Sequence, residues 1–484
     1  MLDTADYLIG VALFLRLLGA IYFVAFGAFL FQYKGLFGTK GILPIDLYLH
    51  HMRQYFKTPW RRFYQIPTVF WWWSSDLALL MVFISGVVLS ILLMLNVYPI
   101  IVLPLLFALY LSVVSAGQDF LSFGWELFLL EITVNAFFLS LTSPANPLIW
   151  LSLNFLLFRF HFEAGVSKLE TRDVNWRNLT ALKFHYQTQP LPNTTAWHAY
   201  WLPMWFHKLS AAMMFFIEII VVFAIFGPKE FRLVAFAGLA GLQLLIWLTG
   251  NFSYLNHLTM VLCVILLSDA YLAPFFGAAT PPAPTNEAFN ILVYIAAAGL
   301  LFLQVVALWN HLMPHATLKK FYFSVYPFHI ANRYGIFAVM TTKRYEIVVE
   351  GSADGCEWKE YLFRYKPSEL TRRPRRVSPY QPRLDWQAWF LPFSSFHSEP
   401  WFQNFLYRLL EGSPPTLALL RHNPFAEDPP RYIRALVYDY EFTDPEMRKK
   451  SGQWWTRRFV GAYSPTLSLS KAIQRKDARV KLKS

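Results

Sequence analysis

Long apolar runs, separated by short polar turns, occupy the chain before about residue 310. Each run is close to 20 residues long, the length that an α-helix needs to cross about 30 Å of hydrocarbon. The pattern predicts a polytopic α-helical membrane bundle of about nine spans within residues 1–309. The expected spans are 8–31, 76–96, 98–116, 124–142, 147–166, 205–227, 231–249, 254–271 and 289–309.

Two polar connections, residues 32–75 and 167–204, interrupt this apolar region. The first ends in Trp71-Trp72-Trp73, which is typical of the aromatic belt at a membrane surface. With nine spans, both connections and the C-terminal region fall on one side of the membrane. Because both connections are rich in Lys and Arg, the positive-inside rule predicts that this side is cytoplasmic.

The remaining residues, 310–484, predict a soluble, β-rich C-terminal domain. Arg344–Glu350 and Cys356–Tyr365 flank a Gly- and Asp-containing turn and are expected to form two strands. Arg431–Phe442 is expected to form another strand. Short helices are expected at 401–410 and 415–421, and a frayed, basic end from about residue 471.

Composition supports a membrane protein. Of 484 residues, 56% are apolar and only 15% are charged, whereas soluble domains carry about 25% charged residues. The net charge is +13, and from His311 onward 28 Lys and Arg face 16 Asp and Glu. A basic domain beside a bilayer can contact membrane lipids or an acidic protein. The basic residues form no recognisable nucleic-acid-binding signature, so nucleic acid is not an expected partner.

Ionisable residues at membrane depth are the candidate functional residues, because burying them in a bilayer is costly. Glu131 and Asn135 lie four residues apart and share a helix face, and Arg159 and Glu163 have the spacing of an ion pair within one helix. The full candidate set is Glu126, Glu131, Asn135, Arg159, His161, Glu163, Lys168 and His185.

Two interpretations of this set remain open. In the first, the residues pair with one another and hold the helices in register. In the second, they line a polar cavity in which His161 and Lys168 transfer a proton or bind an anionic headgroup. No metal site is predicted, because the histidines lack the spacing and the carboxylates of a metal centre.

Several long polar blocks resemble the lipase maturation factors, and together they cover almost the whole chain. They are Gly38–Pro44, Gly117–Glu126, Arg159–Leu169, Trp176–Leu182, His185–Asn193, Tyr326–Gly335, Glu350–Gly355, Gln381–Trp386 and Gly452–Trp455. The resemblance implies a multi-pass membrane protein that assists the folding and assembly of secreted lipases or other client hydrolases. It places a eukaryotic member in the endoplasmic reticulum, with the connections and C-terminal domain in the lumen, which is opposite to the positive-inside prediction. A bacterial member would lie in the inner or plasma membrane.

A shorter block, Ala164–Leu169, is similar to the membrane domain of vitamin K-dependent γ-carboxylases. In that family a lysine at the position of Lys168 acts as a base on a quinol. This resemblance implies, as the alternative, a membrane enzyme that acts on or with a lipid or quinone-like molecule bound near Lys168 and His161. Because the sequence lacks a complete catalytic set, we expect an assembly factor rather than a catalyst, and no obligatory cofactor.

Overall fold

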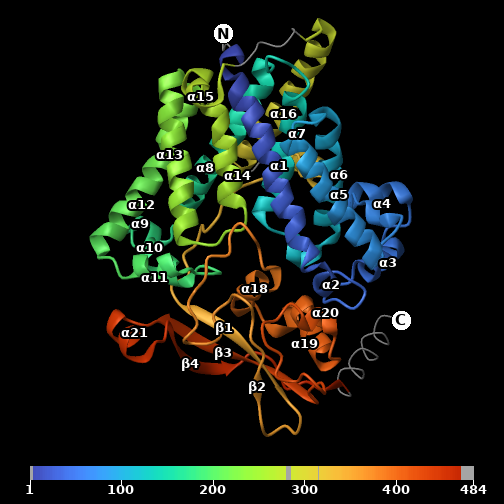
Figure 1. The fold of residues 1–484 in the computed structure, drawn as a ribbon, viewed down its shortest axis with the longest axis vertical. Coiled ribbons are helices and arrows are strands. Elements are labelled where there is room, and N and C mark those ends of the chain that lie inside the picture. The colour runs from blue at the N-terminus through green and yellow to red at the C-terminus, as the bar shows by residue number, and fades with distance from the viewer. Residues whose placement is uncertain (1–3, 279–284, 314–315, 470–484) are drawn as a thin grey trace.

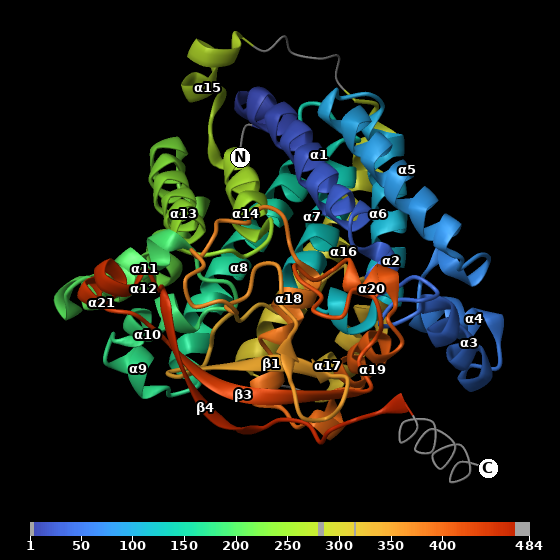
Figure 2. The same ribbon diagram turned by 60° about the horizontal axis from the view of Figure 1, so that its bottom comes forward.

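The computed structural model describes residues 4–278, 285–313 and 316–469. A bundle of long helices occupies one end of the molecule, and a small sheet with short helices occupies the other (Figure 1). Figure 2 shows the sheet in front of the bundle when the lower end is turned forward. The structure therefore has the predicted order of a helical membrane region followed by a sheet-containing region.

Within the described residues, six helical segments are long and apolar enough to cross a membrane. They are η1 with α1 (Thr4–Leu30), α5 (Asp76–Met94), α6 (Pro99–Ala116), α12 with η4 (Met204–Phe226), α13 (Lys229–Thr249) and α16 (Glu287–Leu312). A seventh segment, α14 with η5 (Leu255–Leu266), continues into α15 (Asp269–Phe276) through a 107° bend. The chain bends between the end of η5 at Leu266 and the start of α15, where the Ser268 hydroxyl group caps α15 by accepting a hydrogen bond from the Ala270 N–H.

Two of the nine expected spans lie inside the bundle; one is shorter than a membrane-crossing helix and the other is rich in charged residues. The first, α7 (Gly124–Leu139), has only 16 residues, and the second, α8 (Pro147–Glu170), carries several charged side chains. Both helices pack against α16, and α7 also packs against α6 and α8. Since protein largely surrounds them, they can carry polar residues. Among the described residues, length and composition give six or seven candidate spans, so the expected count of about nine is approximate.

The two polar connections fold into short helices at the end of the bundle that faces the sheet. The first contains α2 (Tyr33–Leu36), α3 (Ile45–Tyr55) and α4 (Pro59–Gln65), and the second contains α9 (Val174–Arg177), α10 (Ala181–Thr188) and α11 (Thr194–Tyr200). Ser413 donates a hydrogen bond to the carbonyl oxygen of Lys40, and Trp197 donates one to that of Thr443. Both connections therefore contact the C-terminal region, at the same end of the molecule (Figure 1).

The C-terminal region contains one antiparallel sheet of order β2-β1-β3-β4. Strands β1 (Arg344–Ser352) and β3 (Tyr432–Phe442) match two of the expected strands, and Val348 lies opposite Leu436. The helices of this region are α17 (Ala316–Val325), α18 (Arg383–Ala388), α19 (Pro400–Leu410), α20 (Pro414–Leu417) and α21 (Pro445–Ser451). The end expected to fray from about residue 471 lies outside the described residues.

Two details of the sheet differ from the sequence-based expectation. The strand expected at Cys356–Tyr365 is only two residues long, β2 (Lys359–Glu360). The residues that follow leave the sheet, because Leu362 forms a β-bridge with His422 and the backbone N–H of Tyr365 donates a hydrogen bond to Asp385. The edge strand β4 (Trp455–Ala462) was not expected.

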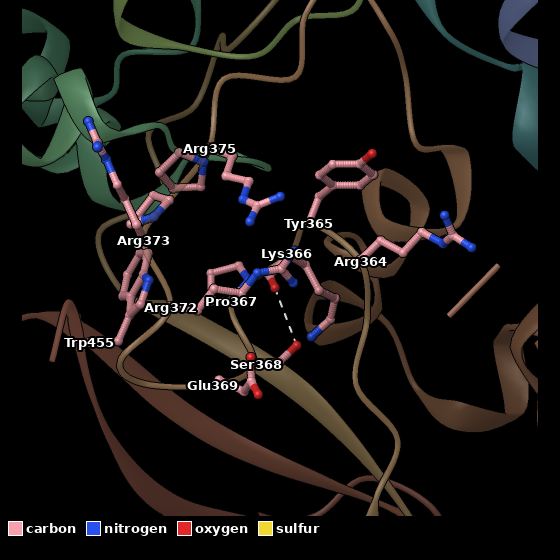
Figure 3. Close-up of a pocket in the computed structure, with 12 residues that line it drawn as sticks. Arg364, Tyr365, Lys366, Pro367, Ser368, Glu369, Arg372, Arg373, Arg375 and Trp455 are labelled. Carbon is pink, nitrogen blue, oxygen red and sulfur yellow. Dashed lines mark hydrogen bonds between the residues drawn. The ribbon is translucent and has the colours of Figure 1, made fainter. Parts of the chain in front are cut away.

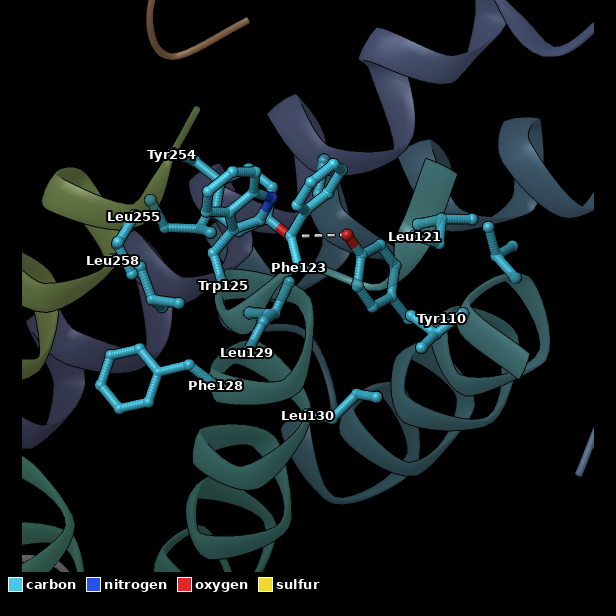
Figure 4. Packing of buried hydrophobic residues seen from close by; sticks show 14 of the residues in the cluster. Tyr110, Leu121, Phe123, Trp125, Phe128, Leu129, Leu130, Tyr254, Leu255 and Leu258 are labelled. Carbon is cyan, nitrogen blue, oxygen red and sulfur yellow. Dashed lines mark hydrogen bonds between the residues drawn. The ribbon is translucent and has the colours of Figure 1, made fainter. Parts of the chain in front are cut away.

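A continuous apolar core joins the bundle to the C-terminal region. Around the start of α7, Phe123 and Trp125 stack on each other near Tyr110 and Tyr254 (Figure 4). Trp386 of α18 packs edge-on against Trp125, with ring centroids 5.0 Å apart. The two parts of the chain therefore bury apolar surface against each other, which favours a fixed arrangement.

Candidate functional site

Glu126 lies in the first turn of α7 and accepts hydrogen bonds from four parts of the chain. Its Oε1 is 2.7 Å from a guanidinium nitrogen of Arg383 in α18, and both partners are buried. Its Oε2 accepts from the hydroxyl groups of Tyr110 and, at 2.6 Å, Tyr254. Trp125 donates its indole N–H to Oε1 at 2.8 Å. Glu126 therefore joins α6, α7 and α14 to the C-terminal region.

A second buried group surrounds Arg159 of α8. Its guanidinium contacts Glu131 of α7 at 3.0 Å and Glu163, one turn further along α8, at 3.1 Å. The same side chain donates to the carbonyl oxygen of Asn332. The side chains of this trio are fully buried, so each charge depends on its partners for stabilisation.

The segment after α17 completes this group. The backbone N–H of Asn332 donates to Glu131 at 2.8 Å, and the backbone N–H of Tyr334 donates to Glu163 at 2.7 Å. The Tyr334 hydroxyl donates to Glu131 at 2.7 Å. The two carboxylates therefore bind main-chain groups of the segment that leads into the sheet, and fix it against the bundle.

Lys168, near the end of α8, forms an ion pair with Glu218 of α12. Its ammonium nitrogen is 2.9 Å from Oε2 of Glu218 and 2.9 Å from the carbonyl oxygen of Ala164. Gly165 allows the approach of the two helices, because a Cβ there would lie only 2.9 Å from Ile219 and 3.1 Å from Cβ of Glu218. The lysine is therefore held as one partner of a buried pair between helices.

The other candidate residues have separate partners. His161 contacts the carboxamide of Gln243 at 3.2 Å and the carbonyl oxygen of Leu157 at 3.1 Å. Asn135 accepts a hydrogen bond from Ser152 at 2.6 Å. His185 of α10 stacks with Phe252, and burial, with a smaller contribution from the charge of Lys168, lowers its pKa to about 4. His185 is therefore neutral at physiological pH.

The eight candidate residues thus fall into several groups of direct contacts, each with its own partners. Glu131, Arg159 and Glu163 share one ion-pair network, and Asn135 donates a hydrogen bond to the backbone carbonyl oxygen of Glu131. Most of these contacts join side chains of different helices. The ion pair within α8 has the four-residue spacing that the sequence suggested, whereas Arg383, Asn332, Tyr334 and Gln243 were not in the candidate set.

An arginine-rich cavity lies elsewhere, where the second connection meets the sheet (Figure 3). It is lined by Pro192, Trp455 and residues 364–369 and 372–375. Burial and the neighbouring charges of Arg421 and Arg375 lower the pKa of Arg372. The cavity volume is about 20 Å³, which suits a single water molecule and is far below the roughly 300 Å³ of a small-molecule site.

The Lys168–Glu218 contact gives a prediction about stability. Lys168→Met leaves Glu218 buried without its counter-charge, and we expect it to lower the free energy of unfolding by about 2–3 kcal/mol. The double variant Lys168→Met/Glu218→Met removes both charges, and we expect it to recover most of that loss. Thermal unfolding of the detergent-solubilised protein measures both; a double variant less stable than Lys168→Met would contradict the pairing role.

Comparison with known proteins assigns the chain to a family. Residues 10–274 match the model of the lipase maturation factor transmembrane domain, and residues 330–465 match that of the lipase maturation factor C-terminal domain. The chain is 33% identical to Lipase maturation factor 1 of Homo sapiens, over 97% of this chain and 90% of that protein. It is 33% identical to Lipase maturation factor 2 of Homo sapiens (94% and 82%) and 31% identical to Lipase maturation factor 2 of Gallus gallus (94% and 81%).

No solved structure matches the chain. The two matched regions correspond to the helical bundle and to the sheet region described above. The matches cover both regions and, at about one third identity, almost the full length of the relatives. The chain therefore belongs to the lipase maturation factor family.

Proposed function

We propose that this membrane protein assists the folding or assembly of a secreted lipase or related hydrolase. The observation that carries the proposal is the similarity of both the bundle and the sheet region to proteins named lipase maturation factors. The proposed function requires no cofactor. Lys168, which the carboxylase-like alternative would use as a base, is ion-paired with Glu218, and this geometry favours a structural role for it.

We place the protein in the endoplasmic reticulum membrane in a eukaryotic cell and in the inner or plasma membrane in a bacterial one. The sheet region and both polar connections then lie together on the side from which the client is secreted. Buried contacts at Glu126 and Arg159 hold the sheet region against the bundle. A client bound there would meet a rigid surface close to the membrane.

Strand β4 is the candidate client-binding surface. It is an edge strand in the described part of the sheet, and it lies on the outer side of the C-terminal region (Figure 2). Phe459 and Val460 are 59% and 51% exposed. An exposed edge with apolar side chains can pair with an extended segment of another chain, which suits an incompletely folded client.

Deletion of the gene in its source organism tests the function. We expect the specific activity of the secreted client lipase to fall several-fold while its messenger RNA stays constant, because the enzyme is made but not correctly assembled. Complementation with the wild-type chain restores the activity. Unchanged specific activity in the deletion strain would contradict the proposed function.

Two variants then test the edge strand. Val460→Lys places a charge on β4, whereas Met447→Lys places the same charge on α21, where Met447 is 41% exposed. We expect the α21 variant to restore lipase activity and the β4 variant to fail at an equal amount of folded protein. Full activity of both variants would contradict the assignment to β4 without affecting the proposed function.

A further inference from the structure

The first polar connection contains a groove that the proposed function does not use. It lies between α3, α4 and the tryptophans that precede α5, and its volume is about 270 Å³. It is lined by Arg53, Pro59, Arg62, Phe63, Trp71 and Trp72. Helices α3 and α4 project from the side of the bundle (Figure 1).

Two arginines of the groove are positioned by neutral acceptors. Arg53 donates to the carbonyl oxygen of Trp71 at 2.5 Å, and Arg62 donates to that of Phe56 at 2.7 Å. These bonds orient the guanidinium groups and leave their charge uncompensated. A guanidinium has five N–H donors, so each arginine retains donors for an anion.

The surrounding charge is strongly positive. The sequence of segment 45–75 contains one acidic residue, Asp46, and four basic residues, Arg53, Lys57, Arg61 and Arg62. Among the described residues, these four cations form no ion pair with a carboxylate. Unpaired cations on adjacent turns repel one another, and an anion bound between them would relieve that repulsion.

The groove is bordered by large, exposed aromatic side chains. Tyr55, Trp60 and Trp72 are 74–78% exposed, and Trp73 is 47% exposed. Trp71–Trp73 immediately precede α5, a candidate span that begins at Asp76, so the groove lies at the level of a helix end in the membrane. Trp and Tyr prefer the headgroup layer, where the apolar ring is buried and the polar atom stays hydrated.

We propose that this groove binds the phosphate group of an anionic phospholipid of the surrounding bilayer. Arg53 and Arg62 donate hydrogen bonds to the phosphate oxygens, and Trp60 and Trp72 insert among the headgroups and upper acyl chains. The occupant is a lipid rather than a dissolved anion because the exposed indoles need an apolar environment beside the charged group. Helices α3 and α4 thereby anchor this end of the protein to the membrane surface, which on the proposed function is the end that meets the client.

Native mass spectrometry of the full-length, detergent-solubilised protein tests this proposal. The probes are phosphatidylglycerol, phosphatidylcholine and inorganic phosphate, titrated separately. We expect phosphatidylglycerol to bind and phosphatidylcholine to bind more weakly. The double variant Arg53→Gln/Arg62→Gln should lose roughly 10- to 30-fold in affinity for phosphatidylglycerol, because each basic residue near an anionic lipid contributes about 1 kcal/mol.

The control is Arg431→Gln/Lys449→Gln, which removes the same charge from exposed positions of the C-terminal region. We expect it to bind phosphatidylglycerol as the wild type does. Equal loss in both double variants, or no loss in the groove variant, would overturn the proposal. Inorganic phosphate that displaces phosphatidylglycerol at equal concentration would also overturn it, because the site would then select the anion and not the lipid.

A second, milder double variant keeps the proposal testable if the glutamine variant fails to fold. Arg53→Lys/Arg62→Lys keeps the charge but loses the planar guanidinium group that binds two phosphate oxygens at once. We expect its affinity for phosphatidylglycerol to lie between those of the wild type and the glutamine variant. Affinity equal to that of the wild type would contradict hydrogen bonding by the two guanidinium groups.

Discussion

Replacing Arg383 with methionine is expected to lower the free energy of unfolding by about 3–5 kcal/mol, the usual cost of breaking a buried ion pair by removing one partner. The guanidinium lies 2.7 Å from Glu126 and also donates to the carbonyl oxygen of Phe120 at 2.6 Å. Without it, Glu126 remains buried with its charge balanced only by neutral donors. Since α18 is held to the bundle at this point, we expect the C-terminal region to detach before the bundle unfolds.

Thermal unfolding of the detergent-solubilised protein, followed by limited proteolysis, measures this effect. The control is Arg421→Gln, which breaks a pair with Glu369 whose side chains are 42% and 37% exposed. Exposed pairs contribute about 0–1 kcal/mol, so the control should resemble the wild type. If Arg383→Met were as stable as this control, the Glu126–Arg383 pair would not join the two regions.

Replacing Arg159 with methionine is expected to have an effect of similar size, about 3–5 kcal/mol, because it leaves two buried carboxylates without their shared cation. Glu131 and Glu163 would then repel each other and release the backbone of Asn332 and Tyr334. We therefore expect faster hydrogen exchange at these two amides than in the wild type. Exchange should change little in strands β1 and β3.

Hydrogen exchange with mass spectrometry on peptides that cover 328–340 measures the local effect. Arg458→Gln provides the control, because Arg458 is 79% exposed and its contact with Asp439 is 3.4 Å long. Exchange at Asn332 and Tyr334 that is the same in Arg159→Met as in this control would show that the carboxylates do not hold the segment.

The sequence predicts the bundle well because hydrocarbon thickness sets the length of lipid-facing helices. Its count of about nine spans is approximate, because α7 and α8 are apolar enough to resemble lipid-facing spans, yet they are largely enclosed by protein and carry Glu131, Arg159 and Lys168. Their charged residues indicate enclosure, but an apolar run does not show which of its faces meets lipid. The sequence does not predict strand β4 either, because apolar and polar residues do not alternate regularly along Trp455–Ala462.

The candidate residues were easier to find than their partners. The pair Arg159–Glu163 follows from four-residue spacing on one helix. The partners Arg383 and Asn332 lie 257 and 173 residues from Glu126 and Arg159, respectively, and spacing carries no information at that range. Both partners fall in polar blocks, 381–386 and 326–335, whose sequence shows a family resemblance but no pairing partner.

For the groove at α3 and α4, the sequence shows the separate features but not their proximity. The sequence identifies Trp71-Trp72-Trp73 as interfacial and the first connection as basic, but it does not bring these features together. Folding places Arg53 and Arg62 in one groove with Trp71 and Trp72, and Arg62 donates a hydrogen bond to the carbonyl oxygen of Arg53. The proposed lipid site therefore arises from the folded arrangement of α3 and α4 and does not appear as a sequence motif.

A density map of the full-length protein in lipid nanodiscs tests the central claim most directly, namely that the bundle and the sheet region form one body joined by buried charges. We predict a sheet region with one orientation relative to the bundle and continuous density between the side chains of Glu126 and Arg383. A sheet region that takes many orientations, or a solvent-filled gap between these two side chains, would contradict the account.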